Sequence, residues 1–349
     1  MKIASVEVIP YALPFREPYV TARGRLDRRE MVLLRLCDDE GQVGLGEAVP
    51  LSLRGSAGLE QVVAGLEALA ERDTLDEATL RGDAIGLSPP ARCAALTALL
   101  DLRGRRAAEE GARDAGARPV SCNATLVSGE ATAVAADALA WLEEGFSTFK
   151  LKLGAGDDVA QVRAVREAVG PEAGIRVDAN ATWDTETAKR TLAQLEPLGV
   201  ELAEQPVAGM KALAEVGSAT SIPIAGDESI ETCADAEAAV RAGACDFAGV
   251  KLSKVGGPEA AIEIAEVMPT FVSSALDGPV GIAAAAQVAQ TLEQAPGGAR
   301  LAHGLATQRL FASTIASVEC ELRGGMLHPP DGPGLGVEID EDALRAHRL

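Results

Sequence analysis

Residues 147–180, STFKLKLGAGDDVAQVRAVREAVGPEAGIRVDAN, contain the repeating unit that decides the fold. The runs STFKLKL (147–153) and GIRVDAN (174–180) are short, apolar and rich in β-branched residues, which is typical of buried strands. Between them, a glycine break leads into a stretch rich in Ala, Val and charged residues that predicts a helix. The order strand, helix, strand therefore predicts one βα repeat and the start of the next.

The same pattern recurs from about residue 119 to 315. The strand-like runs are PVSCNATLV (119–127), STFKLKL (147–153), GIRVDAN (174–180), VELAEQP (200–206), PIAGDES (223–229), DFAGVKL (246–252), TFVSS (270–274) and RLAHG (300–304). Eight such units predict an α/β fold of the (β/α)8 type, a TIM barrel. The alternative, an open doubly wound sheet, usually carries a GxGxxG phosphate loop after its first strand, and this sequence has none there.

The two ends of the chain follow a different pattern. The start reads as a hairpin, KIASVEVIPYALPF (2–15) and MVLLRLCDDEGQVGLGEA (31–48) with a turn at DDEG, and mainly helical sequence follows it. The tail ends in the Pro/Gly-rich HPPDGPGLG and is not another βα unit. We predict an α+β capping domain over 1–118, completed by 318–349, and a barrel catalytic domain over 119–317.

Composition limits the partners. A formal net charge of −20 disfavours binding to nucleic acid and to anionic membranes. Mean hydropathy is +0.11, and no apolar run approaches the ~20 residues of a spanning helix. The opening alternates like a strand and not like a signal peptide, and the six cysteines are spread singly, so we expect a cytoplasmic protein with reduced thiols. The expected partner is a small-molecule carboxylate substrate, and a homo-oligomer is left open.

Five charged residues stand at the carboxyl ends of successive predicted strands. They are Lys152, Asp178, Glu204, Asp227 and Lys251, and neighbouring members are 23 to 26 residues apart. Because each step equals one βα repeat, the five side chains should lie side by side on the rim where barrel enzymes place their active sites. Any one of these acids could simply cap the next helix, but caps have no reason to recur at one height.

The three acids predict a metal site. Asp178, Glu204 and Asp227 would repel one another unless a cation lay among them. Oxygen ligands favour a hard ion, Mg²⁺ or also Mn²⁺, over zinc, and the three histidines are too scattered to form a metal set.

The lysines predict acid–base chemistry. Lys150 and Lys152 are two apart on a strand and point to the same face. Two ammonium groups so close disfavour each other's charged form, which suits Lys152 to act as a general base, with Lys251 on the other side of the substrate. Removal of a proton next to a carboxylate needs this arrangement, because the resulting enediolate carries charge that a metal can neutralise. Taken alone, a KxK pair at a strand end is more often a solvated edge than a catalytic pair.

These residues sit in phrases that resemble the muconate lactonizing enzyme subgroup of the enolase superfamily. The phrases are KLK (150–152), VDANATW (177–183), AEQPV (203–207), AGDES (225–229) and VKLSKVGG (250–257). The resemblance implies that Asp178, Glu204 and Asp227 bind the metal and that Lys152 and Lys251 are the opposed acid/base lysines. Lys150 would then tune Lys152, and Asn180 would hydrogen-bond the metal shell or the substrate.

The reaction depends on a further resemblance. The subgroup includes cycloisomerases, dipeptide epimerases, N-acylamino acid racemases and o-succinylbenzoate synthases. VSSALDGPVGIAAAA (272–286) looks like the segment of the synthases, which implies dehydration of 2-succinyl-6-hydroxy-2,4-cyclohexadiene-1-carboxylate in menaquinone biosynthesis, a lyase reaction. Ser273, Ser274 and free N–H groups of a helix starting near Val280 would receive the substrate's carboxylate. Capping of that helix by the serines is the other interpretation, and racemase, epimerase or cycloisomerase activity is the alternative function.

Overall fold

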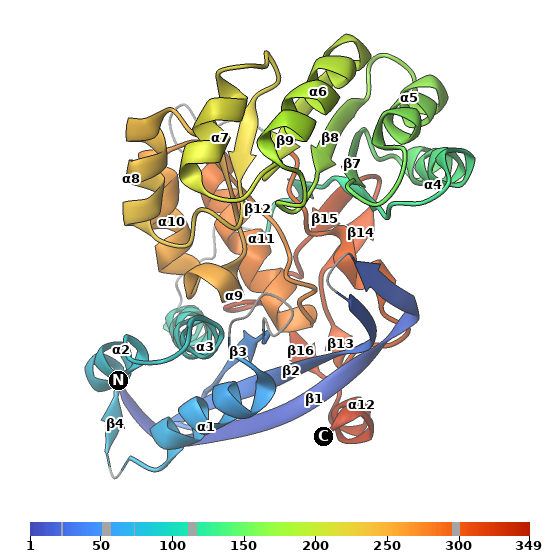
Figure 1. Cartoon of the computed structure of the whole chain (residues 1–349). Coiled ribbons are helices and arrows are strands. Elements are labelled where there is room, and N and C mark those ends of the chain that lie inside the picture. The colour runs from blue at the N-terminus through green and yellow to red at the C-terminus, as the bar shows by residue number, and fades with distance from the viewer. Residues whose placement is uncertain (22–23, 51–56, 73, 111–116, 295–300) are drawn as a thin grey trace.

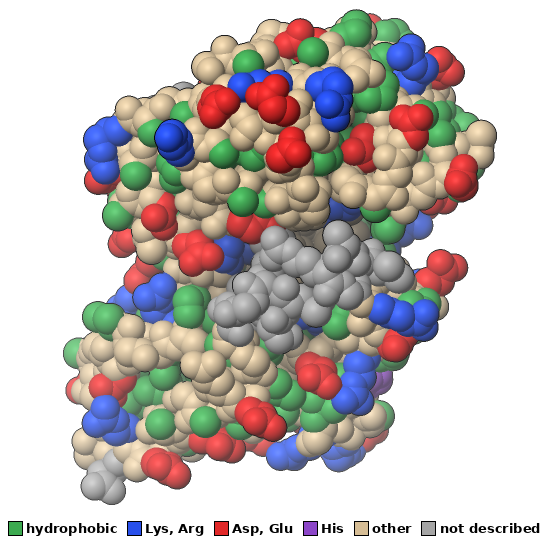
Figure 2. Space-filling view, in the orientation of Figure 1, with side chains coloured by type: hydrophobic (Ala, Val, Ile, Leu, Met, Phe, Trp, Pro, Cys, Tyr) green, Lys and Arg blue, Asp and Glu red, His purple; other side chains and the backbone are tan. Residues whose placement is uncertain are grey.

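The chain folds into two lobes, a capping lobe built on a curved antiparallel sheet and a barrel above it (Figure 1). The computed structural model describes the chain apart from residues 22–23, 51–56, 73, 111–116 and 295–300. Among the helices it describes, none is both long and apolar enough to cross a bilayer. Acidic and basic side chains are interspersed over the face shown in Figure 2.

The capping sheet has four strands in the order β3-β2-β1-β4. They are β1 (Lys2–Thr21), β2 (Gly24–Asp38), β3 (Val43–Ala48) and β4 (Leu75–Asp76), paired antiparallel. The turn between β2 and β3 lies at DDEG as predicted. There, Asp38 Oδ1 accepts hydrogen bonds from the N–H groups of Glu40 and Gln42, and Gly41 takes a φ of 89° that favours glycine.

Three helices complete the capping lobe and pack on this sheet. They are α1 (Leu59–Ala70), α2 (Glu77–Ala84) and α3 (Pro89–Glu109). Helix α3 crosses β3 so closely that a Cβ on Gly46 would lie 1.9 Å from the carbonyl oxygen of Ala94. One face of the sheet forms a hydrophobic cluster with these helices, and side chains of the other face, such as Tyr11 and Leu33, belong to the main cluster of the barrel.

Within the described residues, the barrel contains seven parallel strands in sequential order. They are β6 (Ala124–Leu126), β7 (Thr148–Lys152), β8 (Gly174–Asp178), β9 (Val200–Glu204), β10 (Ile224–Gly226), β11 (Phe247–Val250) and β12 (Thr270–Val272). The helices of the barrel are α4 (Ala131–Glu143), α5 (Asp158–Val169), α6 (Thr185–Leu195), the 3-10 turn η2 (Glu196–Leu198), α7 (Met210–Gly217), α8 (Cys233–Ala242), α9 (Leu252–Val255), α10 (Pro258–Val267) and α11 (Pro279–Gln294). The predicted TIM-barrel class is confirmed.

The eighth strand is much shorter than predicted over 300–304, of which residue 300 lies outside the described residues. His303 and Gly304 form isolated parallel bridges to Cys122 and Ser273, and so join the two ends of the sheet. Around these bridges, side chains make hydrogen bonds to the backbone in place of strand pairing. The N–H of Val272 donates to His303 Nδ1 over 3.0 Å, and the carbonyl of Ala302 accepts from Arg176 over 2.6 Å.

The tail contacts both lobes. After the 3-10 helix η3 (Ala306–Leu310), its elements are β13 (Ala316–Val318), β14 (Glu321–Arg323), β15 (Met326–His328), β16 (Glu338–Ile339) and α12 (Glu341–His347). Strand β15 pairs with β5 (Val120–Ser121), and β13 pairs with β16. The N–H of Leu349 donates to the carbonyl of Pro10 on β1, so both chain ends lie on the capping side (Figure 1). We propose that these last residues complete the capping domain.

Candidate active site

The structure brings the five predicted charged residues together at the carboxyl ends of β7 to β11. Lys152 is the Cα partner of Asp178, which in turn is the partner of Glu204. Asp227 and Lys251 directly follow β10 and β11. Lys152, Asp178 and Glu204 therefore lie at the same level of the barrel, as the spacing predicted. Asp227 and Lys251 are linked to each other by an ion pair.

Lysine ammonium groups lie among the buried carboxylates. Lys150 Nζ is 2.6 Å from Glu204 Oε2 and 2.9 Å from Asp178 Oδ2. Lys152 Nζ is 2.5 Å from Asp178 Oδ2 and donates to Asn180 Oδ1 over 3.0 Å. Lys251 forms an ion pair with Asp227. Asp178 and Asp227 are fully buried and Glu204 is 2% exposed, so each carboxylate needs a partner of opposite charge.

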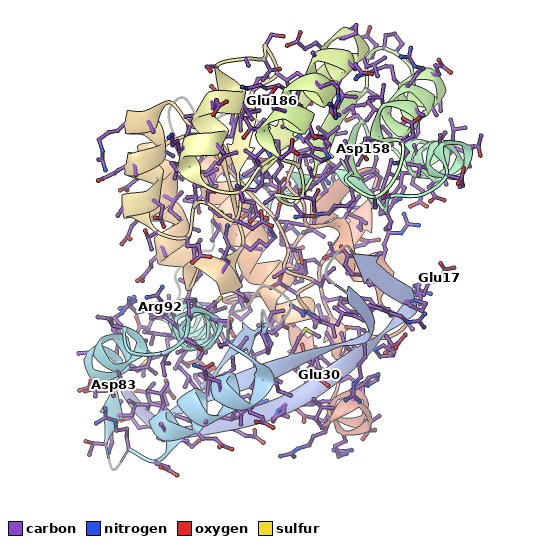
Figure 3. All side chains as sticks on the ribbon, viewed as in Figure 1. Glu17, Glu30, Asp83, Arg92, Asp158 and Glu186 are labelled. Atoms are coloured by element: carbon purple, nitrogen blue, oxygen red, sulfur yellow. The ribbon has the colours of Figure 1, made fainter. Side chains whose placement is uncertain are left out.

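Lys254 belongs to this cluster, although the sequence interpretation did not include it. It lies on the one-turn helix α9, and its Nζ donates to Asp227 Oδ1 over 2.8 Å and to the carbonyl of Gly249 over 3.3 Å. The capping lobe holds the C-terminal end of α9, since Arg92 of α3 donates to the carbonyl of Val255 over 2.9 Å (Figure 3). The only signal in the sequence was its spacing of three from Lys251 in VKLSKVGG.

Burial and charge act in opposite directions on these groups. Burial alone would lower the pKa of Lys150, but Asp178 and Glu204 together hold it above its ordinary value. For Lys150 the two carboxylates within 3 Å of its ammonium group outweigh any repulsion from the neighbouring lysine. Burial likewise opposes ionisation of Asp178, yet Lys150 and Lys152 bring its pKa below the usual range. The pKa of Glu204 is raised, first by burial and then by the charge of Asp178.

The residues present fit a hard dication. Glu204 Oε1 is buried and has no hydrogen-bond partner among the described atoms, which is costly unless a cation satisfies it. Asp227 adds to the repulsion on Glu204, so the three acids are close enough to interact. No three His, Cys, Asp or Glu side chains in the described part of the chain form a closed metal cluster, because lysines pair with these oxygens. An all-oxygen donor set of this kind suits Mg²⁺.

Strained backbone conformations cluster at the same rim. Asn180 and Gln205 have φ of 47° and 39°, in the left-handed region that few non-glycine residues adopt. Gln205 Oε1 accepts from the N–H groups of Asp227 and Ser229, over 2.9 and 3.1 Å, and so fixes the start of the loop after β10. Asn180 is held between Lys152 and the carboxylate of Asp178, which accepts from its N–H over 2.9 Å. Gln205 was not predicted, since nothing but the phrase AEQPV pointed to it.

The serines after β12 are only partly available to a substrate. Ser273 Oγ is buried and has no hydrogen-bond partner among the described residues. Ser274 Oγ donates to Asp277 over 2.7 Å and accepts from Thr307 over 2.8 Å. The prediction of free N–H groups at the start of α11 is wrong at Gly278, whose N–H donates to Glu47 of the capping lobe over 2.6 Å.

Comparisons with known proteins agree with this geometry. The family described as "Enolase C-terminal domain-like" matches residues 133–343. Muconate cycloisomerase 1 of Pseudomonas putida is 30% identical over 362 residues, which cover 97% of this chain and 96% of that protein. The o-succinylbenzoate synthase of Thermobifida fusca (strain YX) is 39% identical over 178 residues, 49% of this chain and 55% of that protein.

A solved structure extends the likeness to three dimensions. The dipeptide epimerase from Cytophaga hutchinsonii, complexed with Mg and the dipeptide D-Ala-L-Val, superposes with a TM-score of 0.88 at 27% identity, covering 99% of this chain and 98% of that one. The fold, the family match over most of the chain and the near full-length relative lead to one conclusion: the chain belongs to the enolase superfamily.

Proposed function

We propose that this chain removes a proton next to a substrate carboxylate, with Lys152 as the base and Lys251 on the opposite side. The observation that carries the proposal is the convergence of these lysines with three buried carboxylates at one barrel rim. Asp178, Glu204 and Asp227 would hold Mg²⁺ or Mn²⁺. A dication bound there would neutralise the negative charge that builds up on the substrate's oxygens.

Exposure separates Lys152 from the other lysines. Its side chain is 24% exposed. The corresponding values are 7% for Lys150, 9% for Lys251 and 4% for Lys254. A base must come within hydrogen-bond reach of the substrate proton, so Lys152 is the lysine best placed to do so. Lys251 forms an ion pair with Asp227 and would stabilise negative charge electrostatically.

The cations of the site favour an anionic substrate. Lys150, Lys152, Lys251 and Lys254 lie at the same barrel rim as the three carboxylates. A bound dication would add two positive charges there, and substrate carboxylates would help to neutralise them.

Within this chemistry we propose o-succinylbenzoate synthase activity. Its substrate, 2-succinyl-6-hydroxy-2,4-cyclohexadiene-1-carboxylate, carries two carboxylates. Lys152 would take the ring proton, the C–H electron pair would move into the ring, and the hydroxyl would leave as water with the proton returned by Lys152. The likeness of 272–286 to the synthases and the identity of 39% with the Thermobifida fusca enzyme support this choice.

Racemisation of N-acylamino acids or dipeptides is the second candidate. It uses the same opposed lysines, and Ser274 and Gly278 already have protein partners that reduce the donors left for a succinyl carboxylate. Muconate-type cycloisomerisation is a further candidate, because muconate cycloisomerase 1 of Pseudomonas putida is 30% identical over most of the chain.

One experiment separates these activities. The purified protein with Mg²⁺ is given the cyclohexadiene and, in a parallel sample in heavy water, an N-succinylamino acid. We expect dehydration of the cyclohexadiene, lost in Lys152→Ala and kept in Lys189→Ala, an exposed helix lysine paired with Glu215. Rapid α-deuteration with inversion and no dehydration would overturn the synthase proposal, and loss of neither activity in Lys152→Ala would overturn the assignment of the base.

A further inference from the structure

A buried polar network joins the capping lobe to the barrel at the start of α11. Glu47, near the end of β3, is 1% exposed. It accepts from the N–H of Gly278 over 2.6 Å and from the Tyr11 hydroxyl over 2.9 Å, and the backbone of Gly281 also donates to it. A carboxylate of one lobe thus caps the positive end of a 16-residue helix of the other.

The packing around Glu47 leaves no spare room. A Cβ on Gly278 would lie 2.4 Å from the Tyr11 hydroxyl oxygen, and a Cβ on Gly281 would lie 2.7 Å from Glu47 Oε1. Both distances are far below contact distance, so the two glycines in LDGPVGI are required by the close approach of the capping lobe.

A third strand of the capping sheet reaches the same segment. Arg29 on β2 is 7% exposed, and its Nη2 donates to the carbonyl of Ala275 over 2.9 Å. Arg29 also interacts electrostatically with the buried carboxylate of Asp277. Strands β1, β2 and β3 therefore each contribute one side chain, Tyr11, Arg29 and Glu47, to the loop 274–278 or to the helix that follows it.

This loop needs support from outside. Leu276 has a φ of 67°, which costs free energy in a residue with a branched side chain. The N–H of Ser273 donates to the carbonyl of Val250 over 2.7 Å, so Ser273 lies beside the residue that precedes Lys251. The sheet therefore fixes Ser273 beside this strand end, and the loop that continues from it, 274–278, depends on contacts with the capping lobe.

We propose that Tyr11, Arg29 and Glu47 form an interdomain latch that holds the loop 274–278, and with it Ser274, in place beside Ser273 and the end of β11. The three are positioning residues, since they act through the loop. The effect on substrate binding rests on the proposed function, whereas the effect on the loop does not. The latch makes the capping lobe a determinant of substrate binding through the seventh strand end.

The test compares Glu47→Gln and Tyr11→Phe with Asp38→Asn in the full chain. Asp38 is a matched control: it is a buried capping-lobe carboxylate that accepts backbone N–H groups, but it lies at the end of β2, beside the turn that leads into β3. Hydrogen exchange read by mass spectrometry should be faster in 274–281 by about tenfold in Glu47→Gln, the effect of losing one charge-assisted hydrogen bond, and unchanged there in Asp38→Asn. Tyr11→Phe keeps the buried ring and should show a smaller increase.

The kinetic arm uses the cyclohexadiene substrate with Mg²⁺. KM should rise several-fold in Glu47→Gln and Tyr11→Phe with a smaller change in kcat, whereas a variant that only lowers the amount of folded protein leaves KM unchanged. If the wild type is inactive, the proposed function fails and the exchange data alone decide on the latch. If both latch variants match Asp38→Asn in loop exchange, the latch is refuted.

Discussion

Replacing Lys150 with methionine should destabilise the metal-free protein strongly and make it depend on Mg²⁺. Lys150 is 7% exposed at its side chain and contacts both Asp178 and Glu204 within 3 Å. Methionine keeps much of the length and the apolar stem but removes the charge. Two buried carboxylates would then lose a shared cation.

The size of the effect follows from burial. Removing one partner of a buried ion pair costs about 3–5 kcal/mol, because the other charge stays buried without compensation. Lys152 still pairs with Asp178, so most of this cost falls on Glu204, whose Oε1 already has no described partner. At roughly 2 °C per kcal/mol for a large domain, the melting temperature should fall by roughly 6–10 °C.

Thermal melts in EDTA and over a series of Mg²⁺ concentrations measure this. A dication that binds the folded state stabilises it, and removal of a competing ammonium group should tighten binding by at least about tenfold. Lys189→Met is the control, since its exposed pair with Glu215 should contribute less than about 1 kcal/mol. An unchanged melting temperature in EDTA, or weaker Mg²⁺ binding in Lys150→Met, would refute the assignment of Glu204 and Asp178 to a cation site.

Three further predictions concern single residues. Lys152→Ala should lower the rate of α-proton exchange by about 10²–10⁴-fold while Mg²⁺ binding, followed by calorimetry, persists; loss of both would mean that the lysine is structural. Burial, and then the charge of Asp277, raise the pKa of Glu47 to about 7. The folded state therefore holds this proton more tightly than the unfolded state does. The free energy of unfolding should fall as the pH rises through about 7. Glu47→Gln should flatten that part of a melting-temperature profile, and an unchanged slope would contradict the assignment. Gly278→Ala should cost about 1–3 kcal/mol because its Cβ would overlap Tyr11 and Glu47, whereas Gly82→Ala, with nothing within 4 Å, should be neutral or stabilising in urea melts; equal effects would count against the tight approach.

The barrel and its charged rim were predictable because both come from one repeat. A parallel strand with a crossover helix takes a nearly constant number of residues, so a spacing of 23 to 26 places side chains at the same height. Lys152, Asp178 and Glu204 are indeed consecutive partners in the sheet. The length of the eighth strand was overestimated. There, side chains of His303 and Arg176 make hydrogen bonds to the backbone, and the pattern of apolar residues does not indicate such bonds.

The residues that escaped prediction act between repeats or between lobes. Gln205 and Lys254 hydrogen-bond to Asp227 from the two neighbouring βα units. The bond from Gln205 depends on its left-handed φ, and the bond from Lys254 depends on the one-turn helix α9. Glu47 meets Gly278 across 231 positions of sequence. No period in the sequence links such a pair, because the contact arises only where the capping lobe packs against the barrel. A side chain of another lobe can occupy the N–H groups at a helix start, as Glu47 does at Gly278, so these groups are not left for a ligand.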